Sequence, residues 1–281
     1  MLAKSLKYDL RAVYKLWLIF SLTLIGISVI GAFALRSLII SEEFTIFSVF
    51  SLGGVLLAVS AFSFYTLGVN ILVFYRYYQN FFTDEAYLTF TLPVKRSTLL
   101  NSQLINSLFW SGISAVVTFV SLLIFLSIAP ADSTNPELIL VTFTRTTFDA
   151  LRAMFCDIGG WLIIYIFLAT LILMASFVFS NILILGCVTL GATMVRKYKL
   201  LMSILVYYAV NMGVSVLSYV LSIIIGITAI GSANALGNYS PLQLHFAMVL
   251  TLISVLMFFI VLSVLIYKFT LARIEKNLNL A

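Results

Sequence analysis

Charged side chains are scarce in this chain of 281 residues: they occupy 9% of the positions, while hydrophobic residues occupy 63%. Soluble globular proteins carry about 25% charged residues, so the composition excludes a soluble globule. The mean hydropathy of +1.16 predicts a protein that lies in a membrane. Proline is scarce too, with four residues. Because the chain also has no low-complexity tract that could serve as a linker, we expect one domain over residues 1–281.

Histidine and cysteine, which supply many metal ligands and nucleophiles, are nearly absent. The one histidine, His245, has no evident nucleophile beside it, and we interpret it as a membrane-interface residue. The two cysteines do not form the Cys-x-x-Cys motif of a zinc site. We expect Cys156 outside the membrane and Cys187 within it, so a disulfide between them is not expected.

Motifs for nucleotide binding and hydrolysis are missing as well. The sequence has neither a Gly-x-Ser-x-Gly elbow nor a His-Glu-x-x-His motif. Three glycine pairs have the spacing of a phosphate-binding loop, but none is followed by Lys-[Ser/Thr]: Gly26/Gly31, Gly186/Gly191 and Gly226/Gly231. We therefore expect no catalytic residue, metal or cofactor in this chain, and we do not expect it to be an enzyme.

The chain does have long apolar runs. They lie near residues 16–35, 50–74, 103–128, 161–192, 201–230 and 244–267, and none contains Asp, Glu, Lys or Arg. A helix of about 20 apolar residues crosses a bilayer. The first run lacks a small-residue cleavage site, so we expect it to remain as a span. The predicted fold is all-α, with six transmembrane helices.

Basic residues are distributed unevenly around these runs. Thirteen of the sixteen Lys and Arg residues fall on one predicted side, and only Arg36, Arg145 and Arg152 fall on the other. Because short loops rich in Lys and Arg stay in the cytoplasm, we predict a multi-pass membrane protein with both termini cytoplasmic. The formal charge of +6 then reflects membrane orientation, and we expect no nucleic-acid partner.

Residues 1–15 are predicted to form an amphipathic helix. At roughly 100° per residue, its apolar face is formed by Leu2, Leu6, Leu10, Val13 and Trp17. A basic cluster lies about 140° away and consists of Lys4, Lys7, Arg11 and Lys15. Such a helix lies in the inner membrane interface, near anionic headgroups. It either anchors the topology alone or acts as an elbow that transmits motion from a cytoplasmic partner.

The predicted cytoplasmic connection over residues 75–102 is unusually apolar for a loop. Its large apolar residues include Phe81, Phe82, Tyr87, Leu88, Phe90 and Leu92. These side chains need a surface that covers them, either inner lipid or another protein, and we favour a protein partner. Within the connection, Thr83 can cap a short helix whose first turn holds Asp84 and Glu85, where the helix dipole favours carboxylates.

Residues 130–160 form the longest predicted outer loop. Their apolar residues are too interrupted to span the membrane, but they fit an interfacial or re-entrant helix. This helix would be a packing element of the outer leaflet or, as the alternative, a lid. Gly159 and Gly160 would allow a sharp entry into the fourth span.

One face of the fifth span carries small residues at every fourth position: Ser218, Ser222 and Gly226. Such a face lets two helices approach closely. We favour this packing role over a lining role in a substrate path.

The stretch from Thr83 to Leu100 reads Thr-Asp-Glu-Ala-Tyr-Leu-Thr-Phe-Thr-Leu-Pro-Val-Lys-Arg-Ser-Thr-Leu-Leu. It resembles a segment of the permease subunits of bacterial ATP-binding-cassette exporters of the second type, those of Gram-positive bacteria above all. The opening Leu6-Lys-Tyr-Asp-Leu-Arg11 and the closing Leu278-Asn-Leu280 are similar to the ends of these permeases. Better-known members carry a large re-entrant element between spans five and six. Here residues 231–243 are short, and the bulk lies between spans three and four.

The resemblance implies a permease in the bacterial cell membrane that pairs with a second permease, identical or different. It implies a separate ATPase subunit, which holds ATP and magnesium and receives residues 75–102 as a coupling helix. Polar contacts with that subunit are expected from Asp84, Glu85, Lys95 and Arg96, and hydrophobic anchors from Phe82, Tyr87 and Phe90. The uncharged spans favour export of a hydrophobic or amphipathic substrate such as a peptide, lipid or drug. The alternative is a membrane scaffold or immunity protein that binds a partner without transport.

Overall fold

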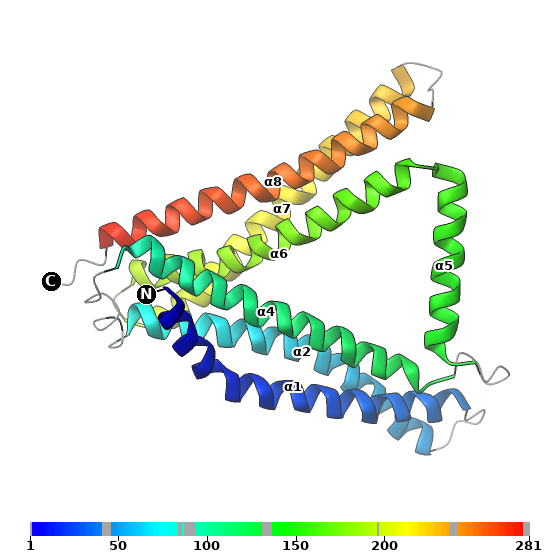
Figure 1. The fold of residues 1–281 in the computed structure, drawn as a ribbon, viewed down its shortest axis with the longest axis horizontal. Helices are drawn as coiled ribbons and strands as arrows, with labels where there is room; N and C mark the ends of the chain where they lie inside the picture. Colours follow the sequence, from blue (N-terminus) through cyan, green and yellow to red (C-terminus); the bar gives the residue numbers. More distant parts are fainter. Residues whose placement is uncertain are drawn as a thin grey trace. The chain divides into compact units, whose positions relative to one another are not determined.

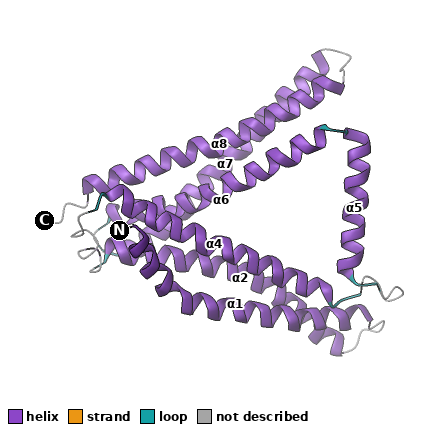
Figure 2. Ribbon diagram, viewed as in Figure 1, coloured by secondary structure: helices purple, strands orange, loops and turns teal. Residues whose placement is uncertain are grey.

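The computed structural model describes residues 2–40, 46–83, 86, 94–130, 137–195, 197–235 and 241–277. For residues 2–7, 222, 224–235, 241, 244 and 277 the description covers the backbone alone. The helices are α1 (Leu2–Ile40), α2 (Ile46–Phe82), α4 (Arg96–Ser127), α5 (Ile139–Ile158), α6 (Trp161–Met194), α7 (Lys199–Ala235) and α8 (Pro241–Asn277) (Figure 1). No strand occurs in the described ranges, so the predicted all-α fold is confirmed there (Figure 2).

Six of these helices, all except α5, are long and apolar enough to cross a membrane. Each predicted apolar run falls inside one of the six, apart from the last residue of the third run, Ile128. The helices are longer than the runs because Lys, Arg and Glu are good helix formers and do not end a helix. α1 accordingly takes in Arg36, and α2 takes in Arg76.

The N-terminal segment is helical, as predicted. It is continuous with the first long helix, because α1 runs from Leu2 to Ile40 without interruption. Figure 1 shows that its first turns bend away from the rest of α1. The position of this segment on a membrane surface stays a prediction.

The chain forms two compact units. Unit 1 comprises Met1–Arg76 and Ile105–Asp157, and unit 2 comprises Tyr77–Leu104 and Ile158–Ala281. α2 and α4 contribute to both units, since the division falls within each of these continuous helices.

Unit 1 is built around α1 and the adjoining parts of α2 and α4. One of its core clusters consists of Ala32, Ala58 and Phe125, one residue from each helix. Gly31 lies beside this cluster, where a Cβ atom would come within 2.3 Å of the Ala58 Cβ. The close approach of α1 and α2 therefore requires glycine at this position.

Unit 2 is built around α6. A core cluster on α6 consists of Phe179, Leu183 and Cys187, and side chains of α7 and α8 pack against it. Gly191 on α6 faces the backbone of α7, where an added Cβ would lie 2.3 Å from the Cα of Ser203. The absence of a side chain at Gly191 thus allows the backbones of α6 and α7 to approach closely.

The outer surface of the long helices is apolar. Phe50, Phe64 and Met174 expose 76%, 71% and 72% of their surface, and many other large hydrophobic side chains are exposed in the same way. Soluble monomers rarely show apolar surface on this scale. Together with the six long apolar helices, this surface indicates a multi-pass membrane protein.

Candidate functional site

The connection between α2 and α4 is the segment in which the sequence places the functional contacts. Of the predicted contact residues, Phe82, Lys95 and Arg96 are described. Four others lie outside the described residues, and their role stays a prediction: Asp84, Glu85, Tyr87 and Phe90.

The end of α2 is an aromatic cluster inside unit 2. Tyr77 and Phe81 are 1% exposed, and Phe82 is 9% exposed. The ring centroids of Tyr77 and Phe81 are 4.8 Å apart, and those of Tyr78 and Phe82 are 6.2 Å apart. Both pairs are four residues apart, a spacing that places side chains on one face of a helix. The sequence predicts a loop from residue 75 onward, whereas helix α2 continues to Phe82. Other parts of the same chain cover the rings of Tyr77, Phe81 and Phe82.

Tyr77 also attaches α2 to α6. Its hydroxyl lies 2.8 Å from the hydroxyl of Thr189, and both groups are buried. Thr189 donates its single hydroxyl proton to the carbonyl of Leu185 at 2.9 Å. The Tyr77 hydroxyl is therefore the donor to Thr189, and both hydroxyl protons are satisfied.

The beginning of α4 is attached to the end of α8. Nη1 of Arg96 donates to the carbonyls of Ile274 at 2.9 Å and Glu275 at 2.6 Å. These carbonyls belong to the last four residues of α8, where a helix leaves carbonyls without an intrahelical partner. Tyr267 adds a second attachment, since its hydroxyl donates to Oδ1 of Asn101 at 2.6 Å. Arg96 is thus engaged within the chain.

Lys95 differs from its neighbour Arg96. Its side chain is exposed, while its carbonyl accepts hydrogen bonds from the amides of Thr98 at 2.9 Å and Leu99 at 3.4 Å. Of the described residues predicted to make polar contacts with a partner, Lys95 is the one whose side chain is freely presented.

The N-terminal segment is held in unit 1 by an ion pair and by apolar packing. Arg76 Nη2 lies 3.3 Å from Asp9 Oδ1, with 7% of the Asp9 side chain exposed. Along the same side of α1, Val13 packs with Val73 and Trp110. The described members of the predicted apolar face, Leu10, Val13 and Trp17, therefore pack against α2 and α4.

The basic residues of this segment are presented differently. Arg11 and Lys15 are exposed, while the side chains of Lys4 and Lys7 lie outside the description. The exposure of Arg11 and Lys15 agrees with a basic face that points away from the protein, and the expected contact with headgroups stays a prediction.

Close helix packing occurs at three of the glycines considered above for phosphate binding. Gly31, Gly186 and Gly191 belong to pairs with phosphate-loop spacing, and each has a neighbour that an added Cβ would strike. By contrast, Ser218 is exposed, and its hydroxyl donates to the carbonyl of Ser215 at 2.7 Å. The side chain of Ser222 and the surroundings of Gly226 lie outside the description. A packing role for these three residues stays a prediction.

His245 lies in a small aromatic cluster at the beginning of α8. Its Nδ1 is 2.7 Å from the hydroxyl of Tyr165, and its ring stacks on Trp161 with centroids 5.3 Å apart. Within the described residues, no group of three His, Cys, Asp or Glu side chains could hold a metal ion.

A comparison of the chain with protein-family models, curated proteins and solved structures finds no match in any of the three.

Proposed function

We propose that this protein is the transmembrane permease subunit of an ATP-driven exporter in a bacterial cell membrane. Both termini and residues 75–102 lie on the cytoplasmic side in this proposal. Two observations support this orientation: the six long apolar helices, and the concentration of basic residues at one set of helix ends.

The observation that carries the proposal is the double attachment of the α2–α4 connection. On the α2 side Tyr77 is bonded to Thr189 of α6, and on the α4 side Arg96 is bonded to the end of α8. A segment that receives force from a partner must be fixed to the helices that it moves. Here a displacement would act on α6 and α8 directly, and on unit 1 through the continuous helices α2 and α4.

In this proposal the partner subunit binds and hydrolyses ATP, and the permease forms the substrate path. ATP and magnesium would be bound by the partner ATPase, because the chain has no Gly-rich loop followed by Lys-[Ser/Thr]. The permease would pair with a second permease, and the substrate would pass between them. An open apolar surface groove of about 440 Å³ between α6 and α8, lined by residues such as Val178 and Ile260, is compatible with a hydrophobic or amphipathic substrate.

The test is co-expression of the chain with the ATPase encoded nearest to it. The variant Asp84→Lys/Glu85→Lys reverses two charges in the segment predicted to dock. We expect the variant to lower co-purification of the ATPase and its stimulation by the permease by at least about tenfold, since like charges would face each other across the interface.

The matched control is Glu42→Lys/Glu43→Lys, which makes the same charge change at an acidic pair predicted on the opposite membrane face. This variant should retain full stimulation. Unchanged stimulation by the Asp84/Glu85 variant would show that the docking assignment is wrong. If the wild-type chain purifies without any ATPase, the scaffold alternative replaces the exporter.

A further inference from the structure

Among the helices of the described residues, α5 has the length of a membrane span, 20 residues, but not the apolar composition of one, and none of its residues is buried. Phe143, Phe148 and Phe155 expose 59%, 73% and 52% of their surface. We infer that α5 lies along the bilayer, with its apolar face in the lipid interface, at the membrane face where α4 ends and α6 begins. This inference goes beyond the proposed function and does not depend on it.

The apolar residues of α5 occupy one side of the helix. At roughly 100° per residue, an apolar arc contains Leu140, Phe143, Phe148, Leu151, Met154 and Phe155. The opposite arc contains Thr142, Arg145, Asp149, Arg152 and Cys156. A helix with one apolar and one charged side and no buried residue is typical of a helix in the plane of a membrane interface.

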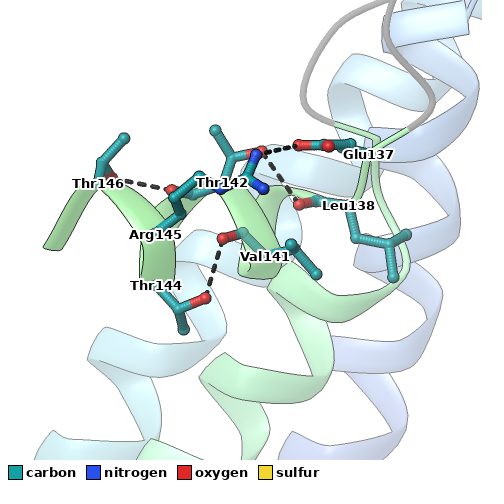
Figure 3. Close-up of polar contacts among 7 residues, drawn as sticks. All are labelled: Glu137, Leu138, Val141, Thr142, Thr144, Arg145 and Thr146. Carbon is teal, nitrogen blue, oxygen red and sulfur yellow. Dashed lines mark hydrogen bonds and ion pairs between the residues drawn. The ribbon is translucent and has the colours of Figure 1, made fainter. Parts of the chain in front are cut away.

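The threonines of α5 are compatible with lipid. Thr144 and Thr147 fall within the apolar arc, and their hydroxyls donate to the carbonyls of Val141 at 2.9 Å and Phe143 at 2.6 Å. The hydroxyl of Thr142 donates to the carbonyl of Leu138, just before α5, and that of Thr146 donates to the carbonyl of Thr142 (Figure 3). Because these hydroxyl protons already have acceptors, they need no water, and the cost of moving them into the interface is small.

The two ends of α5 are tied to the ends of two long helices. At its beginning, the amide of Ile139 donates to the carbonyl of Ala129 at 2.9 Å, two residues after the end of α4. At its end, Gly159 has a φ of +65°, which terminates α5, and α6 begins at Trp161. If α4 and α6 cross the membrane, both ends of α5 lie at one face. A helix of about 30 Å with both ends at one face lies along that face.

The net charge of α5 indicates how the helix would contact the membrane. It would bind by burying its apolar side chains, and anionic headgroups would contribute little. The helix carries two arginines and two aspartates, Arg145, Arg152, Asp149 and Asp157, whose charges cancel. Arg145 lies 3.6 Å from Glu137, and both side chains are exposed (Figure 3). Attachment should therefore be nearly independent of the fraction of anionic lipid, in contrast to binding through a basic helix.

The experiment uses nitroxide labels on the full-length protein in phosphatidylcholine vesicles. Cys156 is the native label site on the polar arc. Phe148→Cys and Leu151→Cys, each combined with Cys156→Ser, place the label on the apolar arc, and Asp149→Cys in the same Cys156→Ser background is the matched neighbour of Phe148. We expect the ratio of oxygen to water-soluble nickel accessibility to be at least about threefold higher at 148 and 151 than at 149 and 156.

Two results would overturn the inference. Equal nickel accessibility at all four sites would place α5 in water. Protection of positions 148 and 151 from both reagents would mean that protein covers the apolar arc. Neither result involves an ATPase, so failure here is distinguishable from failure of the proposed function.

Discussion

At the scale of single residues, the closest contacts are made by small side chains. Gly191 and Ser203 bring the backbones of α6 and α7 together, and the Ser203 hydroxyl donates to the carbonyl of Lys199 at 2.8 Å. Such contacts matter in a membrane, where lipid and leucine are equally apolar and helices associate mainly by packing. The residue that limits the packing is therefore a glycine.

We expect Gly191→Ala to destabilise the α6–α7 pair by about 3 kcal/mol, because the added methyl group meets backbone atoms that cannot rotate away. The measurement is the thermal unfolding midpoint of the protein in detergent. Gly213→Ala on α7 is the control, since nothing lies within 4 Å of its added Cβ. The control should be neutral or up to about 1 kcal/mol stabilising through helix propensity. Equal midpoints for the two variants would contradict the packing described.

At the scale of elements, Arg96 decides how α8 ends. A cation near a helix C-terminus interacts favourably with the helix dipole, and here it also satisfies two terminal carbonyls. We expect Arg96→Ala to cost about 1–3 kcal/mol and to speed hydrogen exchange in the last turn of α8. Lys95→Ala is the control and should leave the exchange unchanged, because the Lys95 side chain is exposed.

The exchange experiment also separates two roles for Arg96. A residue that contacts only an ATPase would alter stimulation without changing exchange in the isolated permease. Unchanged exchange in Arg96→Ala would therefore contradict the capping role and return Arg96 to the set of partner contacts.

The elements also show what the sequence could and could not predict. Apolar runs located the six long helices, because hydrophobicity is a local property of the chain. The burial of Phe82 could not be predicted, because it depends on α2 continuing through residues that look like a loop. The bonds from Tyr77 to Thr189 and from Arg96 to Ile274 join residues 112 and 178 positions apart. The periodicity of apolar residues along a helix cannot predict contacts between residues so far apart in the sequence.

At the scale of the whole molecule, the distribution of charge predicts an orientation that a single thiol can test. Cys156 on α5 is exposed and Cys187 on α6 is buried, so one native cysteine is accessible to a thiol reagent and the other is covered by the protein. If basic residues keep the termini and the 196–199 connection in the cytoplasm, Cys156 lies on the outer face.

We expect a membrane-impermeant maleimide to label the protein in intact cells, and Cys156→Ser to abolish that labelling. The internal control is Tyr198→Cys in the Cys156→Ser background. Tyr198 is 82% exposed and lies in the connection predicted to be cytoplasmic, so a thiol there should react only after the cells are permeabilised. The reverse pattern, with position 198 labelled in intact cells and Cys156 protected, would invert the orientation. The α2–α4 connection would then face away from cytoplasmic ATP, and an ATPase could not dock on it.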